Sequence, residues 1–217
     1  MRILVTGSDG FIGKNLQVRL AERSDIEVIC FTREHDQASL SGLLEGVSLV
    51  VHLAGVNRPV DPEEFVTGNQ NLTEQLCAAI VEAKRDIRVI YTSSSQAVQE
   101  NKYGMSKLAA EDALFHLQSA YGIPVHIFRL PNVFGKWSKP NYNSVVATFC
   151  HNTARGLSLQ INDPSADLTL VYVDDVVERF IELIDLANAE DAGGFETVTP
   201  EYRTTVGAIA NQLAAFK

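Results

Sequence analysis

The chain has 217 residues, 46% of them hydrophobic, which is enough for one sizeable core and a small additional lobe. A net charge of −9 and a pI near 5.0 provide no general basic surface, so nucleic acid and anionic membranes are not expected as partners. Short apolar runs and the absence of a signal-peptide pattern favour a cytoplasmic protein. The three cysteines lack disulfide or metal-like spacing, and no metal site is expected.

Short β-branched runs alternate with helical patterns up to about residue 135. The predicted strands cover residues 2–7, 27–32, 48–55, 88–94 and 125–133, and the predicted helices cover residues 11–23, 39–46, 63–84 and 103–122. Strands joined by helical crossovers favour an α/β fold with a doubly wound parallel sheet of the Rossmann type. The carboxyl ends of such strands meet at one edge of the sheet, where ligands bind.

Beyond residue 136, predicted strands and helices no longer alternate regularly. Helices are expected at residues 141–156, 174–189 and 204–216, and short strands at residues 157–161 and 168–173. We therefore expect a Rossmann core in residues 1–135. A small C-terminal substrate-binding lobe with closing helices would occupy residues 136–217 of the same structural domain.

A glycine-rich turn, TGSDGFIG, joins the first strand to the first helix. Gly7 permits a tight turn, Gly10 lets a pyrophosphate approach the backbone, and Gly13 lets the helix pack closely. The turn therefore predicts a dinucleotide site, the alternative being a strand-to-helix turn that only needs glycine.

The second strand ends in CFTRE, where an acidic residue would bind the ribose hydroxyls of NAD. Thr32 is neutral and Arg33 offers a planar, permanently charged group to a 2′-phosphate, which favours NADPH. NADH stays the alternative, with Arg33 as a solvated cation, because Glu34 lies one residue later than the usual acid.

Tyr103 and Lys107 are four residues apart at the start of a predicted helix, so both side chains project from one face. An ammonium close to a phenol is expected to lower the pKa of Tyr103 toward neutrality and suit it to proton transfer. The preceding strand ends in TSSSQ, and a hydroxyl there can stabilise a developing alkoxide. Alternation along the strand should turn one of Ser94 and Ser95 toward the site.

Polar residues that follow the fifth strand are candidates for substrate binding. Asn132 lies at the binding edge and can contact a sugar diphosphate, or it can be a turn-forming asparagine. The segment that follows carries two cations, Lys136 and Lys139, with Trp137 and Asn143. In an acidic protein these residues suit a clamp for an anionic nucleotide-sugar, the alternative being an ordinary surface loop.

Taken in order, the glycine-rich turn, the serine-rich strand end and the Tyr–Lys pair resemble those of the extended short-chain dehydrogenase/reductases. A closer resemblance is to the reductase domains that form UDP-2-acetamido-2,6-dideoxy-L-talose on the bacterial path to UDP-N-acetyl-L-fucosamine for capsules and O-antigens. Three segments carry it: HLAGVNRP at 52–59, the run from FGKW to ATFC at 134–150, and LTLVYVDD at 168–175. It implies NADPH-dependent reduction of the 4-keto group of a UDP-2-acetamido-2,6-dideoxy-hexos-4-ulose.

The resemblance also implies roles for individual residues. The cofactor would be held by Gly7, Asp9, Gly10, Phe11, Ile12, Gly13, Arg33, Leu53, Ala54, Gly55, Tyr103, Lys107 and Leu130. The catalytic residues would be Ser94, Tyr103 and Lys107, and the substrate would be bound by Ser94, Ser95, Asn132, Lys136, Lys139 and Asn143. Relatives place the catalytic hydroxyl at the position of Ser94 rather than Ser95.

Relatives also suggest a homodimer and a metal-binding cupin domain in the full-length enzyme, which this chain does not include. The arginine with which many relatives hold the nucleotide is replaced near Leu168. Three other functions stay open. A 4,6-dehydratase would need an acid where Ser95 and Gln96 stand, a nucleotide-sugar 4-epimerase would keep NAD tightly bound, and a sensor module would bind the dinucleotide without catalysis.

Overall fold

The computed structural model describes residues 1–186 and 192–216. Within them, the main sheet has six parallel strands in the order β2-β1-β3-β4-β5-β8. Their bounds are β1 (Arg2–Thr6), β2 (Glu27–Phe31), β3 (Leu49–His52), β4 (Arg88–Ser94), β5 (Val125–Leu130) and β8 (Gly194–Glu196). The chain proceeds outward from β1 in both directions, which confirms the predicted doubly wound sheet of the Rossmann type.

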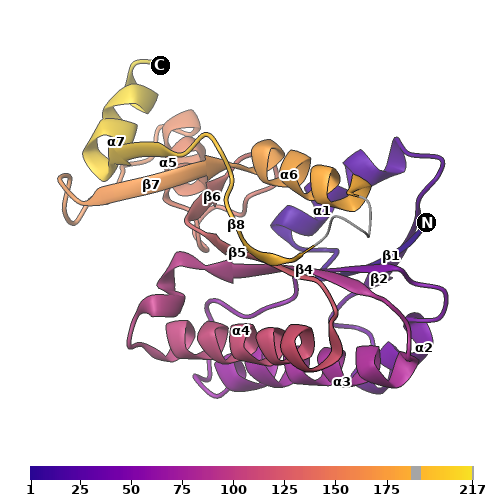
Figure 1. Ribbon diagram of the computed structural model, residues 1–217. Coiled ribbons are helices and arrows are strands. Elements are labelled where there is room, and N and C mark those ends of the chain that lie inside the picture. The colour runs from indigo at the N-terminus through magenta and orange to yellow at the C-terminus, as the bar shows by residue number, and fades with distance from the viewer. Residues whose placement is uncertain (187–191, 217) are drawn as a thin grey trace.

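Helices cover both faces of this sheet (Figure 1). One face carries α1 (Phe11–Ala21) and α6 (Val173–Asp185), and the other carries α2 (Leu40–Leu43), α3 (Leu72–Ala83) and α4 (Lys102–Tyr121). Shorter helical turns are η1 (Gln37–Ser39), the π-helical η2 (Val66–Asn71) and η3 (Ser95–Val98). Because both faces are covered, the central strands are buried, including all four residues of β3 and all seven of β4.

A second, smaller sheet stands beyond the carboxyl ends of the main strands, at the left of Figure 1. It consists of β6 (Asn132–Phe134), β7 (Asp167–Tyr172) and β9 (Tyr202–Thr205), flanked by α5 (Val145–Ala154) and α7 (Val206–Ala214). The ring of Phe134 packs against those of Tyr172 and Tyr202 and joins the three strands. Residues 136–217 thus contribute to both sheets, because α6 and β8 return to the main one.

Two expectations for this C-terminal part are wrong, and a third lies partly outside the described residues. The strand predicted at residues 157–161 is wrong: the segment is irregular and Leu157 is 55% exposed, so its apolar residues have no sheet to pack on. The last helix begins at Val206 rather than residue 204, because Thr205 ends β9 and its Oγ1 accepts a hydrogen bond from the Ala208 N–H at 3.2 Å. The part of a predicted helix that covers residues 187–189 lies outside the described residues.

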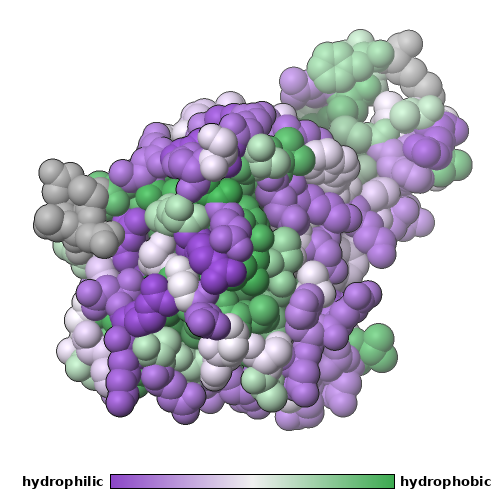
Figure 2. All heavy atoms as spheres, turned by 90° about the vertical axis from the view of Figure 1, so that its right-hand side faces the viewer, coloured by the Kyte–Doolittle hydropathy of each residue, from purple (hydrophilic) through white to green (hydrophobic). Residues whose placement is uncertain are grey.

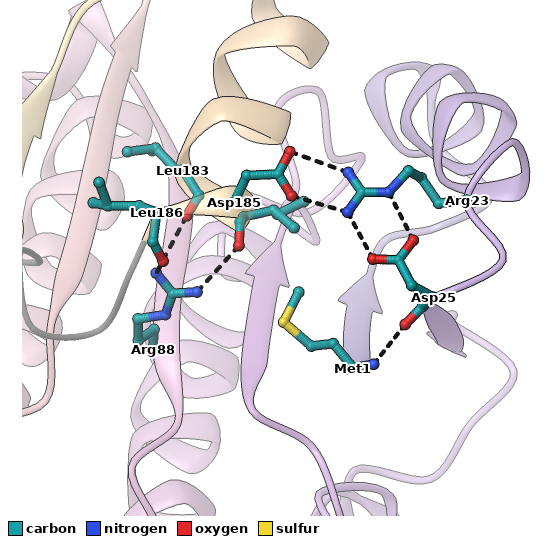
Figure 3. Close-up of polar contacts among 8 residues, drawn as sticks. Met1, Arg23, Asp25, Arg88, Leu183, Asp185 and Leu186 are labelled. Carbon is teal, nitrogen blue, oxygen red and sulfur yellow. Dashed lines mark hydrogen bonds and ion pairs between the residues drawn. The ribbon is translucent and has the colours of Figure 1, made fainter.

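The returning helix α6 is fastened to the main sheet at its carboxyl end (Figure 3). The buried guanidinium of Arg88, the first residue of β4, donates to the carbonyls of Leu183, Ile184 and Leu186 at 3.1–3.3 Å. A cation at this end of a helix satisfies the last carbonyls and opposes the negative end of the helix dipole. Arg23 adds surface ion pairs to Asp185 and Asp25.

The end of the molecule where the main strands begin faces the viewer in Figure 2. Hydrophilic side chains form most of its rim, and hydrophobic residues show between the layers. Across the described residues, no helix is both long enough and apolar enough to span a bilayer.

Candidate active site

A cleft of about 650 Å³ lies at the carboxyl edge of the main sheet. Its lining comes from the turns that follow β1 to β4, the start of α4 and the segment that runs from β5 into the smaller lobe. The predicted residues that line it are Gly7, Asp9, Gly10, Phe11, Ile12, Gly13, Arg33, Leu53, Gly55, Ser94, Ser95, Tyr103, Lys107, Leu130, Asn132, Lys139 and Asn143. Ala54 and Lys136 do not line it.

The glycine-rich turn leaves no room for a side chain at Gly7 or Gly13. Gly7 has a φ of +64°, and a Cβ there would lie 2.7 Å from the backbone nitrogen of Ala54. A Cβ on Gly13 would overlap the carbonyl oxygen of Gly7 and lie 2.7 Å from that of Ser8. Helix α1 then begins with no side-chain cap and no acidic residue in its first turn. Its N–H groups and positive dipole end suit a diphosphate, so the residues present fit a dinucleotide.

Residues after β3 support this turn and form the next part of the cleft. The Ala54 N–H donates to Thr6 Oγ1 at 3.1 Å, so Ala54 lies behind Gly7 and not in the cleft. Gly55 faces the catalytic region, since a Cβ there would lie 2.9 Å from Asn69 Oδ1 and 3.5 Å from Lys107 Nζ. The absence of a side chain at Gly55 keeps space open beside the ammonium.

The first turn of α4 carries the predicted acid–base pair. Asn101 caps the helix, accepting a hydrogen bond from the Gly104 N–H at 2.8 Å. A Cβ on Gly104 would lie 2.5 Å from the carbonyl oxygen of Gln99, so glycine lets the helix begin directly against η3. Tyr103 and Lys107 both reach the cleft from this helix, as their spacing predicts.

The environment of this pair changes one expectation. Burial raises the pKa of Tyr103, and a hydrogen bond with Ser94 acts in the opposite direction. Lys107 Nζ donates to the carbonyl of Thr92 at 2.8 Å and lies 4.6 Å from the ring centroid of Tyr91. The expected lowering of the pKa of Tyr103 by Lys107 is therefore not observed. A phenol whose pKa is raised keeps its proton at neutral pH, which suits a proton donor.

The pKa of the Lys107 ammonium is also shifted from its ordinary value. Burial lowers the pKa of Lys107 to about 8, against an opposing influence of Glu111. A charged amine is poorly solvated in this position, and the interactions with Thr92 and Tyr91 offset only part of that cost.

The structure distinguishes the two candidate serines by their contacts. Ser94 ends β4, is buried, and accepts a hydrogen bond from the Gln96 N–H at 3.1 Å. Ser94 also interacts with Tyr103, in the direction that lowers the pKa of the phenol. Ser95 is exposed at the start of η3, where strand alternation has ended, so both serines line the cleft. Of the two, Ser94 is the serine that influences the pKa of Tyr103.

The opposite wall of the cleft is more exposed. Asn132 begins β6, with its Nδ2 donating to the Thr169 carbonyl at 3.3 Å. Lys139 lies 5.6 Å from the ring centroid of Tyr142. Trp137 is 53% exposed and has a φ of +67°, an uncommon conformation for a bulky residue that is often found at ligand sites. Lys139, Tyr142, Asn143 and Trp137 all line the cleft.

Lys136 borders this wall, with its Nζ 5.8 Å from the ring centroid of Trp137. Its Nζ lies 3.2 Å from Asp174 Oδ1, at the start of α6. The Lys136 carbonyl accepts a hydrogen bond at 3.1 Å from Asn15 Nδ2, so the loop is held to the cofactor helix α1. Lys136 thus connects the two lobes, and its contact with substrate stays a prediction.

Sequence reasoning overlooked Asn69, which is buried in the π-helical turn η2. Its Oδ1 accepts from the Val56 N–H at 2.8 Å, and its Nδ2 donates to Val56 O and Ser106 Oγ, both at 2.9 Å. Ser106 Oγ in turn donates to the Tyr103 carbonyl at 2.8 Å. Asn69 thus joins the loop after β3 to the catalytic helix. A polar GNQN run within an apolar helical pattern was its only sequence signal.

A second omission is the pair Asn57 and Arg58, which also line the cleft. They belong to the HLAGVNRP segment, in which the prediction of site residues stopped at Gly55.

Comparison with known proteins agrees with this geometry. A sequence profile of the NAD dependent epimerase/dehydratase family matches residues 3–195, most of the chain. The chain belongs to the NAD dependent epimerase/dehydratase family. Membership confirms the prediction of an extended short-chain dehydrogenase/reductase.

Two members of the family are similar over the whole of this chain. It is 53% identical to a UDP-2-acetamido-2,6-beta-L-arabino-hexul-4-ose reductase from Pseudomonas aeruginosa and covers 58% of that protein. It is 38% identical to the capsular polysaccharide assembling protein CapF from Staphylococcus aureus, with a TM-score of 0.86, and again covers 58% of that chain. The chain therefore spans about three fifths of the length of these family members.

The fold extends to more distant members. A UDP-glucuronic acid 4-epimerase from Bacillus cereus, solved in complex with NAD, has a TM-score of 0.87 at 22% identity. The chain covers 84% of that epimerase, and at this identity the likeness concerns the fold alone.

Proposed function

We propose that this chain is the reductase part of an enzyme that reduces the 4-keto group of a UDP-2-acetamido-2,6-dideoxy-hexos-4-ulose with NADPH. The product would be UDP-2-acetamido-2,6-dideoxy-L-talose, in bacterial synthesis of UDP-N-acetyl-L-fucosamine for capsules or O-antigens. One observation carries the proposal. Ser94, Tyr103 and Lys107 line a single cleft beside a glycine turn suited to a dinucleotide. The 53% identity to a reductase of a UDP-amino-hexulose supports the choice of substrate.

The residues of the chain divide the reaction between them. NADPH, when bound, supplies the hydride for the keto carbon. Tyr103 donates its proton to the carbonyl oxygen, which suits a phenol whose pKa is raised. Ser94 hydrogen-bonds the same oxygen as negative charge develops on it. Lys107 would hold ribose hydroxyls of the cofactor, as a charged hydrogen-bond donor.

The substrate nucleotide is assigned to the exposed wall. Leu168 is buried in β7, so the place where many relatives carry an arginine offers no contact to UDP. Lys139 and Arg58 are cations that line the cleft, and Trp137 and Tyr142 add aromatic surfaces. We assign the diphosphate to these cations and the uracil to an aromatic surface, with Asn132 and Asn143 as hydrogen-bonding partners.

The preference for NADPH rests on Arg33. It lies in the cleft lining just after β2, and its loop is folded by a hydrogen bond at 3.2 Å from the Thr32 N–H to His35 Nδ1. A guanidinium in this place can pair with a 2′-phosphate, which NADH lacks. The homodimer, the cupin domain in the full-length protein and the cytoplasmic location stay predictions.

One assay tests reaction, cofactor and substrate class together. The protein would be incubated with isomers of UDP-4-keto-6-deoxy-HexNAc and either NADPH or NADH, following the absorbance of the reduced nicotinamide and identifying the sugar by NMR. We expect steady NADPH oxidation with one isomer. Stoichiometric co-purified NAD(H) without net consumption would instead indicate a 4-epimerase. Failure of every isomer to react would favour a dinucleotide-binding sensor.

A further inference from the structure

A buried carboxylate next to the catalytic helix has no part in the mechanism above. Glu111, in α4, is fully buried. It accepts a hydrogen bond from Ser93 Oγ, and Arg129 donates to it through Nε at 3.1 Å and Nη2 at 2.6 Å. A buried carboxylate is costly unless charge and hydrogen bonds compensate for it, and these contacts provide both. Glu111 and Arg129 lie behind the cleft, and Ser93 connects them to its lining.

Each partner of Glu111 adjoins a residue of the cleft. Ser93 precedes Ser94 in β4, and Arg129 precedes Leu130 in β5. Because Ser93 directly precedes Ser94, a hydrogen bond that fixes Ser93 toward α4 also restricts how Ser94 is oriented at the end of β4, next to Tyr103. Glu111 is also one helical turn beyond Lys107 on the same face of α4.

We propose that Glu111 is a positioning residue, which fixes the end of β4 so that Ser94 faces Tyr103 and keeps the Lys107 side chain charged. The inference rests on the proposed function for the roles of Ser94 and Lys107. The contacts with Ser93 and Arg129 hold the Glu111 carboxylate where it can both fix the end of β4 and keep Lys107 charged.

The groups around Lys107 single out Glu111 as its electrostatic partner. Burial lowers the pKa of His52, in β3, to about 3, so this histidine is neutral. Burial also raises the pKa values of Tyr91 and Tyr103, so both phenols are neutral at pH 7. Glu111 acts to raise the pKa of Lys107 against the effect of burial. Without the carboxylate, Lys107 should lose its proton at a lower pH.

The direct test measures the ionisation of Lys107 without any substrate. Wild type, Glu111→Gln and Asp112→Asn would be labelled with ¹³C at lysine Cε and titrated by NMR, with the Lys107 signal assigned from Lys107→Met. Asp112 is the matched control, since it is the next residue of α4 but exposed. We expect Glu111→Gln to lower the Lys107 midpoint by about one pH unit and Asp112→Asn to leave it in place.

The second test separates positioning from charge. Ser93→Ala leaves the Glu111–Arg129 pair intact, so the Lys107 midpoint and the KM for NADPH should not change, while kcat falls about tenfold because Ser94 is less well held. If Glu111→Gln does not fold, Glu111→Asp, which retains the charge, should keep the wild-type Lys107 midpoint within a few tenths of a pH unit. In that case Ser93→Ala and Glu111→Asp test the inference.

Two results would overturn the inference. An unchanged Lys107 midpoint in folded Glu111→Gln would leave only a structural ion pair, and a wild-type kcat in Ser93→Ala would remove the positioning role. The failure of the proposed function is recognisable separately. In that case no 4-keto sugar is reduced by the wild type, yet the Lys107 midpoint still shifts in Glu111→Gln.

Discussion

The two walls of the cleft are built in different ways. The cofactor wall is formed by closely packed backbone, since Gly7 and Gly13 have no space for a Cβ, and by buried side chains such as Lys107. On the substrate wall, Trp137 and Lys139 are exposed side chains in a long connection between β6 and α5. A rigid wall suits chemistry that tolerates little displacement, and an exposed loop suits selection among ligands. Substitutions on the two walls should therefore fail in different ways.

The largest effect should come from Tyr103→Phe, on the rigid wall. This variant removes the proton donor but keeps the ring that packs on Phe65, so we expect kcat to fall about 10²- to 10⁴-fold with cofactor affinity nearly unchanged. Steady-state kinetics and NADPH fluorescence titration measure the two quantities. Retained turnover would show that another group transfers the proton.

The next effect tests how tightly the same wall is packed. In Gly13→Ala the new Cβ would meet the carbonyl oxygens of Gly7 and Ser8, so α1 must move away from the turn. We expect a loss of NADPH affinity of at least roughly tenfold and a lower melting temperature, by calorimetry.

Gly42→Ala is the matched control for this prediction. Gly42 lies in α2, and a Cβ on it would meet no atom within 4 Å beyond its chain neighbours and the backbone of its own helix, so alanine should preserve cofactor binding and slightly raise stability. Equal loss of affinity in both variants would refute the packing argument.

A smaller effect is expected at the edge of the cofactor wall, where Arg33 is exposed. Arg33→Ala should raise the KM for NADPH roughly tenfold and leave that for NADH nearly unchanged, because the 2′-phosphate is the group that loses its partner. Kinetics with both cofactors measure the KM for NADPH relative to that for NADH in the wild type and in Arg33→Ala. Increasing salt should reduce the difference between the two proteins. Equal effects on both cofactors would mean that Arg33 does not recognise the 2′-phosphate.

The difference between the two walls of the cleft also explains how much of the fold and the site could be predicted from sequence. The glycine turn and the Tyr103–Lys107 pair are local patterns, and their positions in the cleft follow from a few residues of spacing. Lys136 could not be placed that way, since its partner Asp174 lies 38 residues further on. The small sheet depends likewise on pairings between β6, β7 and β9 that are distant in sequence. The raised pKa of Tyr103 needed the burial of the folded state.

The smallest effect should distinguish two neighbouring lysines on the substrate wall. Lys139 lines the cleft, whereas Lys136 pairs with Asp174 outside it. Lys139→Ala should therefore raise the KM for the UDP-sugar several-fold with little change in kcat, because an exposed cation contributes modestly to binding. Lys136→Ala, the matched control, should leave that KM unchanged. If both lysines raised the KM equally, substrate recognition would depend on the charge of the whole loop rather than on the side chain that reaches the cleft.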